Sequence, residues 1–79
     1  MFRIYSDENE GDAKDRFDLG IPGSLKDIEP IVGKLADGQT VRLYDSDGME
    51  VDAIIEFEKA CGRWMARPIW ETLKQPEGN

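Results

Sequence analysis

Residues 41–70 read VRLYDSDGMEVDAIIEFEKACGRWMARPIW, and this stretch says most about the architecture of the protein. From residue 49 to residue 58 the odd positions are apolar and the even positions are acidic, with Ile54 as the exception. Successive side chains of a strand point to opposite faces of a sheet, so this two-residue period predicts a half-buried strand. We expect the whole stretch to form one continuous antiparallel β-meander.

Two turns fix the register of this meander. Ser46-Asp47-Gly48 suits a three-residue hairpin loop in which Gly48 supplies a positive φ. Residues 59–62 suit a four-residue loop. Both turns bring apolar residues opposite apolar residues and acids close to arginines, and this agreement supports the topology. The predicted pairs are Leu43 with Val51, Val41 with Ala53, Arg42 with Asp52, Phe57 with Trp64, Ile55 with Ala66, and Glu56 with Met65.

The segments outside the meander carry weaker signals. Phe2 and Ile4, and then Phe17 and Leu19, alternate with polar residues and predict two short strands. Residues 6–15 predict an exposed acidic loop, and residues 75–79 a frayed tail. Phe57 and Trp64 are expected in the core, where truncation to alanine would cost about 3–5 kcal/mol.

One short helix is expected at about residues 24–35. Ser24 is predicted to cap its N-terminus, and a stripe of apolar residues should touch the odd-numbered face of the meander. Pro30 interrupts the pattern, because a proline inside a helix removes a hydrogen bond and clashes with the preceding turn. We favour a single helix kinked at Pro30 over two short turns, the second starting at Pro30. The stripe consists of Leu25, Ile28, Val32 and Leu35.

Residues 35–43 follow the pattern L-x-x-G-x-x-V-x-L, with Leu35, Gly38, Val41 and Leu43 at the defined positions. This pattern resembles the entry into a strand found in SH3-like small β-barrels. Barrels of this family mostly bind peptides, RNA or other proteins and rarely catalyse, so the resemblance implies a binding domain. The chain differs from the family in carrying a helix before the turn and in lacking the aromatic and acidic loops of peptide-binding SH3 domains, so no binding residues are transferred.

The predicted fold is therefore mainly β within the α+β class. It is a small antiparallel SH3-like barrel or a strongly bent five-stranded sheet with one short helix, and the alternative is an open α+β sheet with the helix packed on one face. The 79 residues form a single small domain. As a whole, the sequence also resembles a small bacterial protein.

Charge and composition narrow the classes of partner. The formal net charge is −7 and the bases are dispersed among acids, which disfavours direct nucleic-acid binding. The single cysteine, Cys61, favours a reducing compartment, and no apolar stretch is long enough for a membrane span or a secretory signal. We expect a cytoplasmic protein without membrane contact.

Few residues suggest catalysis or a cofactor. The chain has no histidine, which removes the commonest general base and metal ligand. Asp45, Asp47 and Glu50 at one hairpin tip faintly suggest calcium, but Asp-Ser-Asp-Gly is also ordinary turn chemistry. Cys61, near Lys59 and Arg63, is interpreted as an incidental turn residue and not as a nucleophile. We expect neither an enzyme nor a bound cofactor or metal.

Four residues are candidates for contact with a partner. Tyr44, Ile54 and Met65 interrupt the charges on the predicted outer face of the meander, and Trp70 follows its last strand. Exposed apolar clusters often mark interfaces, and tryptophan is enriched at binding hot spots. We favour the interpretation that the chain itself covers the first three, because so small a domain needs its apolar residues for its own core.

The leading functional hypothesis is a non-catalytic protein-interaction or regulatory module, with another protein as partner or a second copy of the chain. The first alternative is an acidic inhibitor or immunity-type protein that binds a basic partner, since residues 7–12 are rich in acids. The second alternative is a small-molecule or metal-binding domain.

Overall fold

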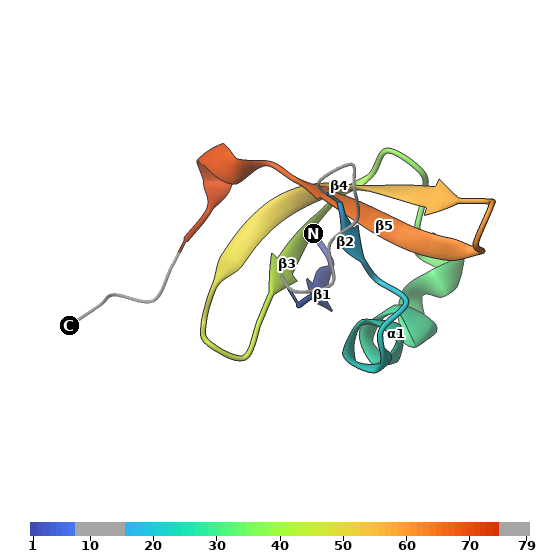
Figure 1. Ribbon diagram of the computed structural model, residues 1–79, viewed down its shortest axis with the longest axis horizontal. Coiled ribbons are helices and arrows are strands. Elements are labelled where there is room, and N and C mark those ends of the chain that lie inside the picture. Colours follow the sequence, from blue (N-terminus) through green and yellow to red (C-terminus); the bar gives the residue numbers. More distant parts are fainter. Residues whose placement is uncertain (8–15, 75–79) are drawn as a thin grey trace.

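A five-stranded mixed sheet, curled into a half-barrel, forms the body of the molecule (Figure 1). The computed structural model describes residues 1–7 and 16–74. The acidic loop predicted at 6–15 lies largely outside the described residues, and the predicted tail at 75–79 lies wholly outside them. The strand order across the sheet is β1-β3-β4-β5-β2. The strands are β1 (Arg3–Tyr5), β2 (Phe17–Asp18), β3 (Thr40–Tyr44), β4 (Glu50–Glu58) and β5 (Arg63–Pro68).

The meander of β3, β4 and β5 is confirmed with the predicted register. Val41 pairs with Ala53 and Leu43 with Val51, and the Asp45 amide donates to the Met49 carbonyl at 3.2 Å to close the first hairpin. Gly48 has a φ of 93°, as the three-residue loop requires. The alternation of apolar and charged residues fixed this register, because a slip by one residue would turn every apolar side chain outward.

The second hairpin also follows the prediction. Phe57 pairs with Trp64, Ile55 with Ala66 and Glu56 with Met65. Arg67 lies diagonal to Glu56, with its Nη2 3.6 Å from the carboxylate. After β5 the chain continues along β4, where the Ile69 amide donates to the Asp52 carbonyl at 2.8 Å.

The sheet is mixed, and the expectation of a purely antiparallel sheet is wrong. Strand β1 pairs in parallel with β3, with Arg3 opposite Arg42 and Ile4 opposite Leu43. A parallel pair needs a long connection between its strands. Here the connection runs through β2 and the helices before it returns as β3.

The helical segment breaks where the sequence places Pro30, and the predicted single kinked helix is wrong. Helix α1 (Pro22–Ile28) ends before the proline, and a 3₁₀ helix, η2 (Glu29–Lys34), continues the chain. The alternative of two short turns is closer to the structure. A third short helix, η3 (Trp70–Thr72), follows β5. Across the described residues, no helix has the length and apolar character needed to cross a membrane.

Ser24 does not cap the helix as predicted. Helix α1 begins two residues earlier, with Ile21 as its N-cap and Pro22 in the first turn, where the missing N–H of proline costs nothing. The Ser24 hydroxyl is fully buried and donates instead to the Tyr5 carbonyl. It therefore holds α1 against β1.

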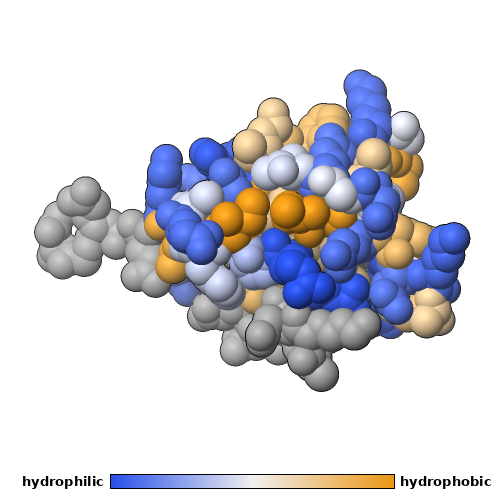
Figure 2. Space-filling model, turned by 90° about the horizontal axis from the view of Figure 1, so that it is seen from above, coloured by the Kyte–Doolittle hydropathy of each residue, from blue (hydrophilic) through white to orange (hydrophobic). Residues whose placement is uncertain are grey.

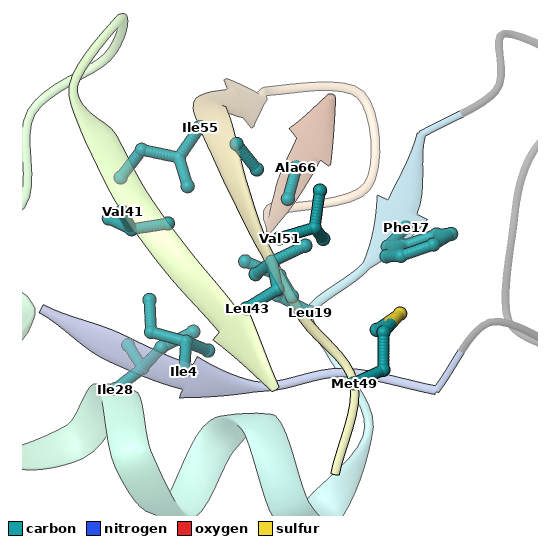
Figure 3. Packing of buried hydrophobic residues seen from close by; sticks show 11 residues of the cluster. Ile4, Phe17, Leu19, Ile28, Val41, Leu43, Met49, Val51, Ile55 and Ala66 are labelled. Carbon is teal, nitrogen blue, oxygen red and sulfur yellow. The ribbon is translucent and has the colours of Figure 1, made fainter. Parts of the chain in front are cut away.

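The core fills the concave side of the half-barrel (Figure 3). Ile4, Val41, Leu43 and Ile55 are all fully buried, and Ile28 of α1 packs beside Ile4. Leu35 packs against this cluster as predicted. The expectation that the whole helical stripe would face the sheet is wrong for half of its members. Leu25 and Val32 are exposed, because the break at Pro30 turns the two helical segments away from one continuous face.

Phe57 lies side by side with Trp64, but it is not in the core. Their ring centroids are 5.1 Å apart in an edge-to-face arrangement. Phe57 is 41% exposed, since it lies near the end of β4, where Trp64 only partly covers it. The expected cost of Phe57→Ala falls accordingly, to about 1–2 kcal/mol.

Candidate interaction surface

A repeated triplet lies on the two strands at one edge of the sheet, β1 and β3. Residues 3–5 read Arg-Ile-Tyr and residues 42–44 read Arg-Leu-Tyr. The parallel register brings the two triplets side by side, so that Arg3 lies next to Arg42 and Tyr5 next to Tyr44. Ile4 and Leu43 point into the core, and the four flanking side chains therefore point away from it. We call Arg3, Tyr5, Arg42 and Tyr44 the Arg/Tyr face.

The two tyrosines of this face are packed together. Their ring centroids are 5.8 Å apart and the rings meet edge to face at 77°. The Arg3 guanidinium lies 4.8 Å from the centre of the Tyr44 ring, within reach of a cation–π contact. On the other side, a Cβ added to Gly23 of α1 would lie 2.6 Å from the Tyr5 ring. Helix α1 thus packs directly on Tyr5, and any larger residue at position 23 would push it away.

Asp27 of α1 fastens the tyrosine end of the face. Its carboxylate accepts a hydrogen bond from the Tyr44 hydroxyl at 2.5 Å and from the Tyr5 amide at 3.0 Å. The hydrogen bond from Tyr44 to Asp27 raises the pKa of the Tyr44 phenol above 10.0, with burial and the charge of Asp27 acting in the same direction. Together with Ser24, Asp27 also pairs the outward backbone groups of Tyr5, which would otherwise form an open sheet edge.

The arginine end of the face is more open. Arg42 uses its Nε to contact Asp52 at 3.0 Å, and Arg3 uses one Nη to contact Glu50 at 3.4 Å. The Arg42 side chain is 34% exposed and the Arg3 side chain 59%. A hollow of about 180 Å³ lies beside them, lined by Met1, Arg3 and Arg42 among the described residues. The hollow is open to solvent, and both arginine residues line it.

Seen from above, the molecule exposes several hydrophobic side chains between hydrophilic ones (Figure 2).

The structure separates the four residues that the sequence singled out as contacts. Tyr44 belongs to the Arg/Tyr face and is half-buried. Ile54 is also half-buried on the outer face, but it pairs with Thr40, whereas Tyr44 pairs with Glu50 at the other end of β3. The two residues therefore do not form one apolar cluster.

Met65 is buried, with 5% exposure, and cannot contribute to an exposed surface. It lies between Asp18 and Glu56 in the register of β2, β5 and β4. Arg16 spans the same strands, since its guanidinium reaches Glu56 at 3.2 Å and Glu58 at 3.3 Å. This charged network ties the short strand β2 to β4 across β5.

Trp70 is half-exposed but lies apart from Tyr44. Its ring packs edge-on against Phe17 at a centroid distance of 6.0 Å, and the Phe17 side chain belongs to the core. Trp70 therefore borders the core at the rim of the sheet.

Asp45 and Cys61, which were considered for metal binding and for reactivity, both lie in turns of the meander. The Asp45 carboxylate accepts from the amides of Asp47 and Met49, both at 2.9 Å, and so stabilises its own turn. Cys61 is exposed in the turn after β4, with its Sγ 3.9 Å from the Glu58 carbonyl oxygen. Within residues 1–7 and 16–74, no group of three or more His, Cys, Asp or Glu residues could hold a metal ion.

Sequence reasoning missed Arg3, Tyr5, Arg42 and Asp27 as members of one site. The signal was the repeated Arg-apolar-Tyr triplet, whose meaning depends on the parallel pairing of β1 with β3. Compared with known proteins, the chain matches no family model, no curated protein and no solved structure. The resemblance to SH3-like barrels thus stays a prediction.

Proposed function

We propose that this protein is a non-catalytic protein-interaction module that binds another protein through its Arg/Tyr face. The observation that carries the proposal is the pairing of two arginines and two tyrosines across β1 and β3. Tyrosine and arginine are enriched among the residues that dominate binding energy. Placed on neighbouring strands, they form a compact group of such residues on a rigid sheet.

The fixed geometry of the face favours binding. Asp27 holds the Tyr44 hydroxyl, α1 packs on the Tyr5 ring, and Arg3 stacks over Tyr44. Side chains that are ordered before binding lose less conformational entropy on association.

A comparative capture experiment tests the proposal. The full chain is immobilised and exposed to an extract of its host, and the bound protein is quantified for the wild type, Arg42→Ala and Arg63→Ala. Arg63 is the matched control, because it also lies on the sheet and pairs with an aspartate, Asp18 at 2.8 Å, but lies far from the Arg/Tyr face in the register. We expect Arg42→Ala to reduce capture at least about ten-fold, a loss of ~1.4 kcal/mol, and Arg63→Ala to leave it unchanged.

Equal capture by all three proteins would contradict the proposal. If moderate salt abolishes capture but Arg42→Ala does not change it, the hypothesis of an acidic inhibitor that binds a basic partner would be favoured, because screening weakens contacts between exposed charges. Sedimentation of the purified chain reveals whether the face binds a second copy instead. In that case a dimer would form, and Arg42→Ala would dissociate it.

A further inference from the structure

We propose that the hollow between Arg3 and Arg42 receives a carboxylate group of the partner protein. The inference rests on the proposed function and names the chemistry that the Arg/Tyr face recognises. The carboxylate belongs to an acidic side chain or to the C-terminus of the partner.

Both arginines have N–H donors that no described residue uses. A guanidinium has five N–H groups in a planar fork that matches the two oxygens of a carboxylate. Arg42 engages only its Nε with Asp52, and Arg3 engages only one Nη with Glu50 over a long 3.4 Å contact. Among the described residues, the remaining donors of both side chains have no hydrogen-bond partner, and both residues line the hollow.

The parallel register also places two like charges side by side. Arg3 and Arg42 are direct neighbours in the register, and like charges that face each other across a strand pair repel. Their acidic partners, Glu50 and Asp52, lie on β4, to one side of the pair. A carboxylate in the hollow would neutralise the two guanidinium groups from the open side and form paired charge-assisted hydrogen bonds.

The charges around the two arginines favour a carboxylate over other anions. Glu50 and Asp52 contact the arginines, Asp27 lies at the tyrosine end of the same face, and the whole chain carries a net charge of −7. Such surroundings repel a phosphate dianion or a nucleic-acid backbone more strongly than a single carboxylate. The hollow of about 180 Å³ holds a carboxylate with a short aliphatic stem, given that a water molecule occupies about 30 Å³.

An NMR titration of the full chain tests this inference with defined probes. The probes are acetyl-glutamate amide for a side-chain carboxylate, acetyl-glycine for a C-terminal one, acetyl-glutamine amide as the neutral isostere, and inorganic phosphate. All are added at constant ionic strength while the Nε signals of the arginines are followed. We expect saturable shifts of Arg3 and Arg42 with at least one carboxylate in the millimolar range, weaker binding of phosphate, and no saturable shift with the neutral probe. The carboxylate probe that binds more tightly shows whether the hollow prefers an acidic side chain or a C-terminus of the partner.

Two variants complete the test. Arg42→Lys keeps the charge but loses the planar fork, and we expect it to weaken carboxylate binding about ten-fold. Arg63→Lys should leave binding unchanged, and a dispersed spectrum confirms that each variant is folded. Absence of saturable carboxylate binding, tighter phosphate binding, or unchanged affinity in Arg42→Lys would each overturn the inference.

The two proposals can fail separately. If Arg42→Ala abolishes partner capture but the chain binds no carboxylate probe, the proposed interaction module is supported and the carboxylate site is refuted. Carboxylate binding together with unchanged capture would refute the Arg/Tyr face as the contact surface for the partner.

Discussion

Removal of the Tyr44 hydroxyl should destabilise the protein by a predictable amount. In Tyr44→Phe the 2.5 Å hydrogen bond to Asp27 is lost, while Asp27 keeps its bond from the Tyr5 amide. Hydrogen bonds to charged groups contribute about 1.5–3 kcal/mol when their partners are desolvated. Tyr44 is only half-buried and Asp27 is not left unpartnered, so we expect a loss of about 1 kcal/mol.

The assay is urea unfolding followed by tryptophan fluorescence. Tyr5→Phe is the matched control, because it removes the same atom from the neighbouring ring. Within the described residues, the hydrogen bonds of Tyr5 use its backbone amide and carbonyl and not its hydroxyl. The control should stay within about 0.5 kcal/mol of the wild type. In a double-mutant cycle with Asp27→Ala, the coupling energy between Tyr44 and Asp27 should be about 1 kcal/mol.

The pH dependence supplies an independent check. The folded-state pKa of Tyr44 is raised above 10.0, so the folded state holds this proton more tightly than the unfolded state. The contribution of Tyr44 is therefore complete below pH 10 and declines as the pH rises through the folded-state pKa. The stability difference between the wild type and Tyr44→Phe should shrink in that alkaline range. A zero coupling energy, or a difference that grows above pH 10, would refute the role assigned to Asp27.

Three further changes test the fold. In the same urea assay, Ile55→Ala should cost about 2–5 kcal/mol and Ile54→Ala about 1 kcal/mol or less, because Ile55 is fully buried and Ile54 points to the outer face. Equal costs for the two variants would contradict the register of β4. Arg16→Ala should lower the unfolding free energy by about 1–3 kcal/mol even at 1 M NaCl, because Arg16 is buried beside two glutamates and salt screens buried ion pairs poorly. A loss of stability that vanishes at high salt would show that these ion pairs are exposed to solvent. Gly48→Ala should cost about 1 kcal/mol of unfolding free energy and so lower the thermal midpoint by several degrees, because φ at Gly48 is 93°. An unchanged midpoint would contradict the turn geometry.

The antiparallel part of the fold could be predicted because two independent patterns constrain it. Alternation in β4 fixes which side chains face the core, and the turns around Gly48 and Gly62 fix the offset of its neighbours. A wrong register would have placed acids such as Asp52 inside the core. The burial of one face thus makes the sequence nearly sufficient for this region.

The placement of β1 could not be predicted in the same way. Arg3-Ile4-Tyr5 alternates equally well in a parallel or an antiparallel pair, and its direction depends on the route of the connection through α1. The Arg/Tyr face follows from that direction, so its members could be seen in the sequence only as a repeated triplet. Asp27 escaped notice for a related reason, since its partners depend on how α1 docks.

The misplacement of exposed apolar residues has a physical cause as well. Periodicity reports which side of an element is apolar, but not how far the opposing layer extends. Phe57 lies near the end of its strand, and Leu25 and Val32 lie on helical segments that Pro30 separates. Their exposure reflects the short reach of the covering elements in so small a domain.

The most direct test of the Arg/Tyr face is a footprint of the bound partner. Backbone amide shifts of the full chain are compared with and without the captured protein. We predict that the largest changes fall on residues 3–5 and 42–44, with smaller changes at Glu50 and Asp52. Changes centred on Leu25 and Val32, or on Trp70, would show that the partner binds another surface and would contradict the account.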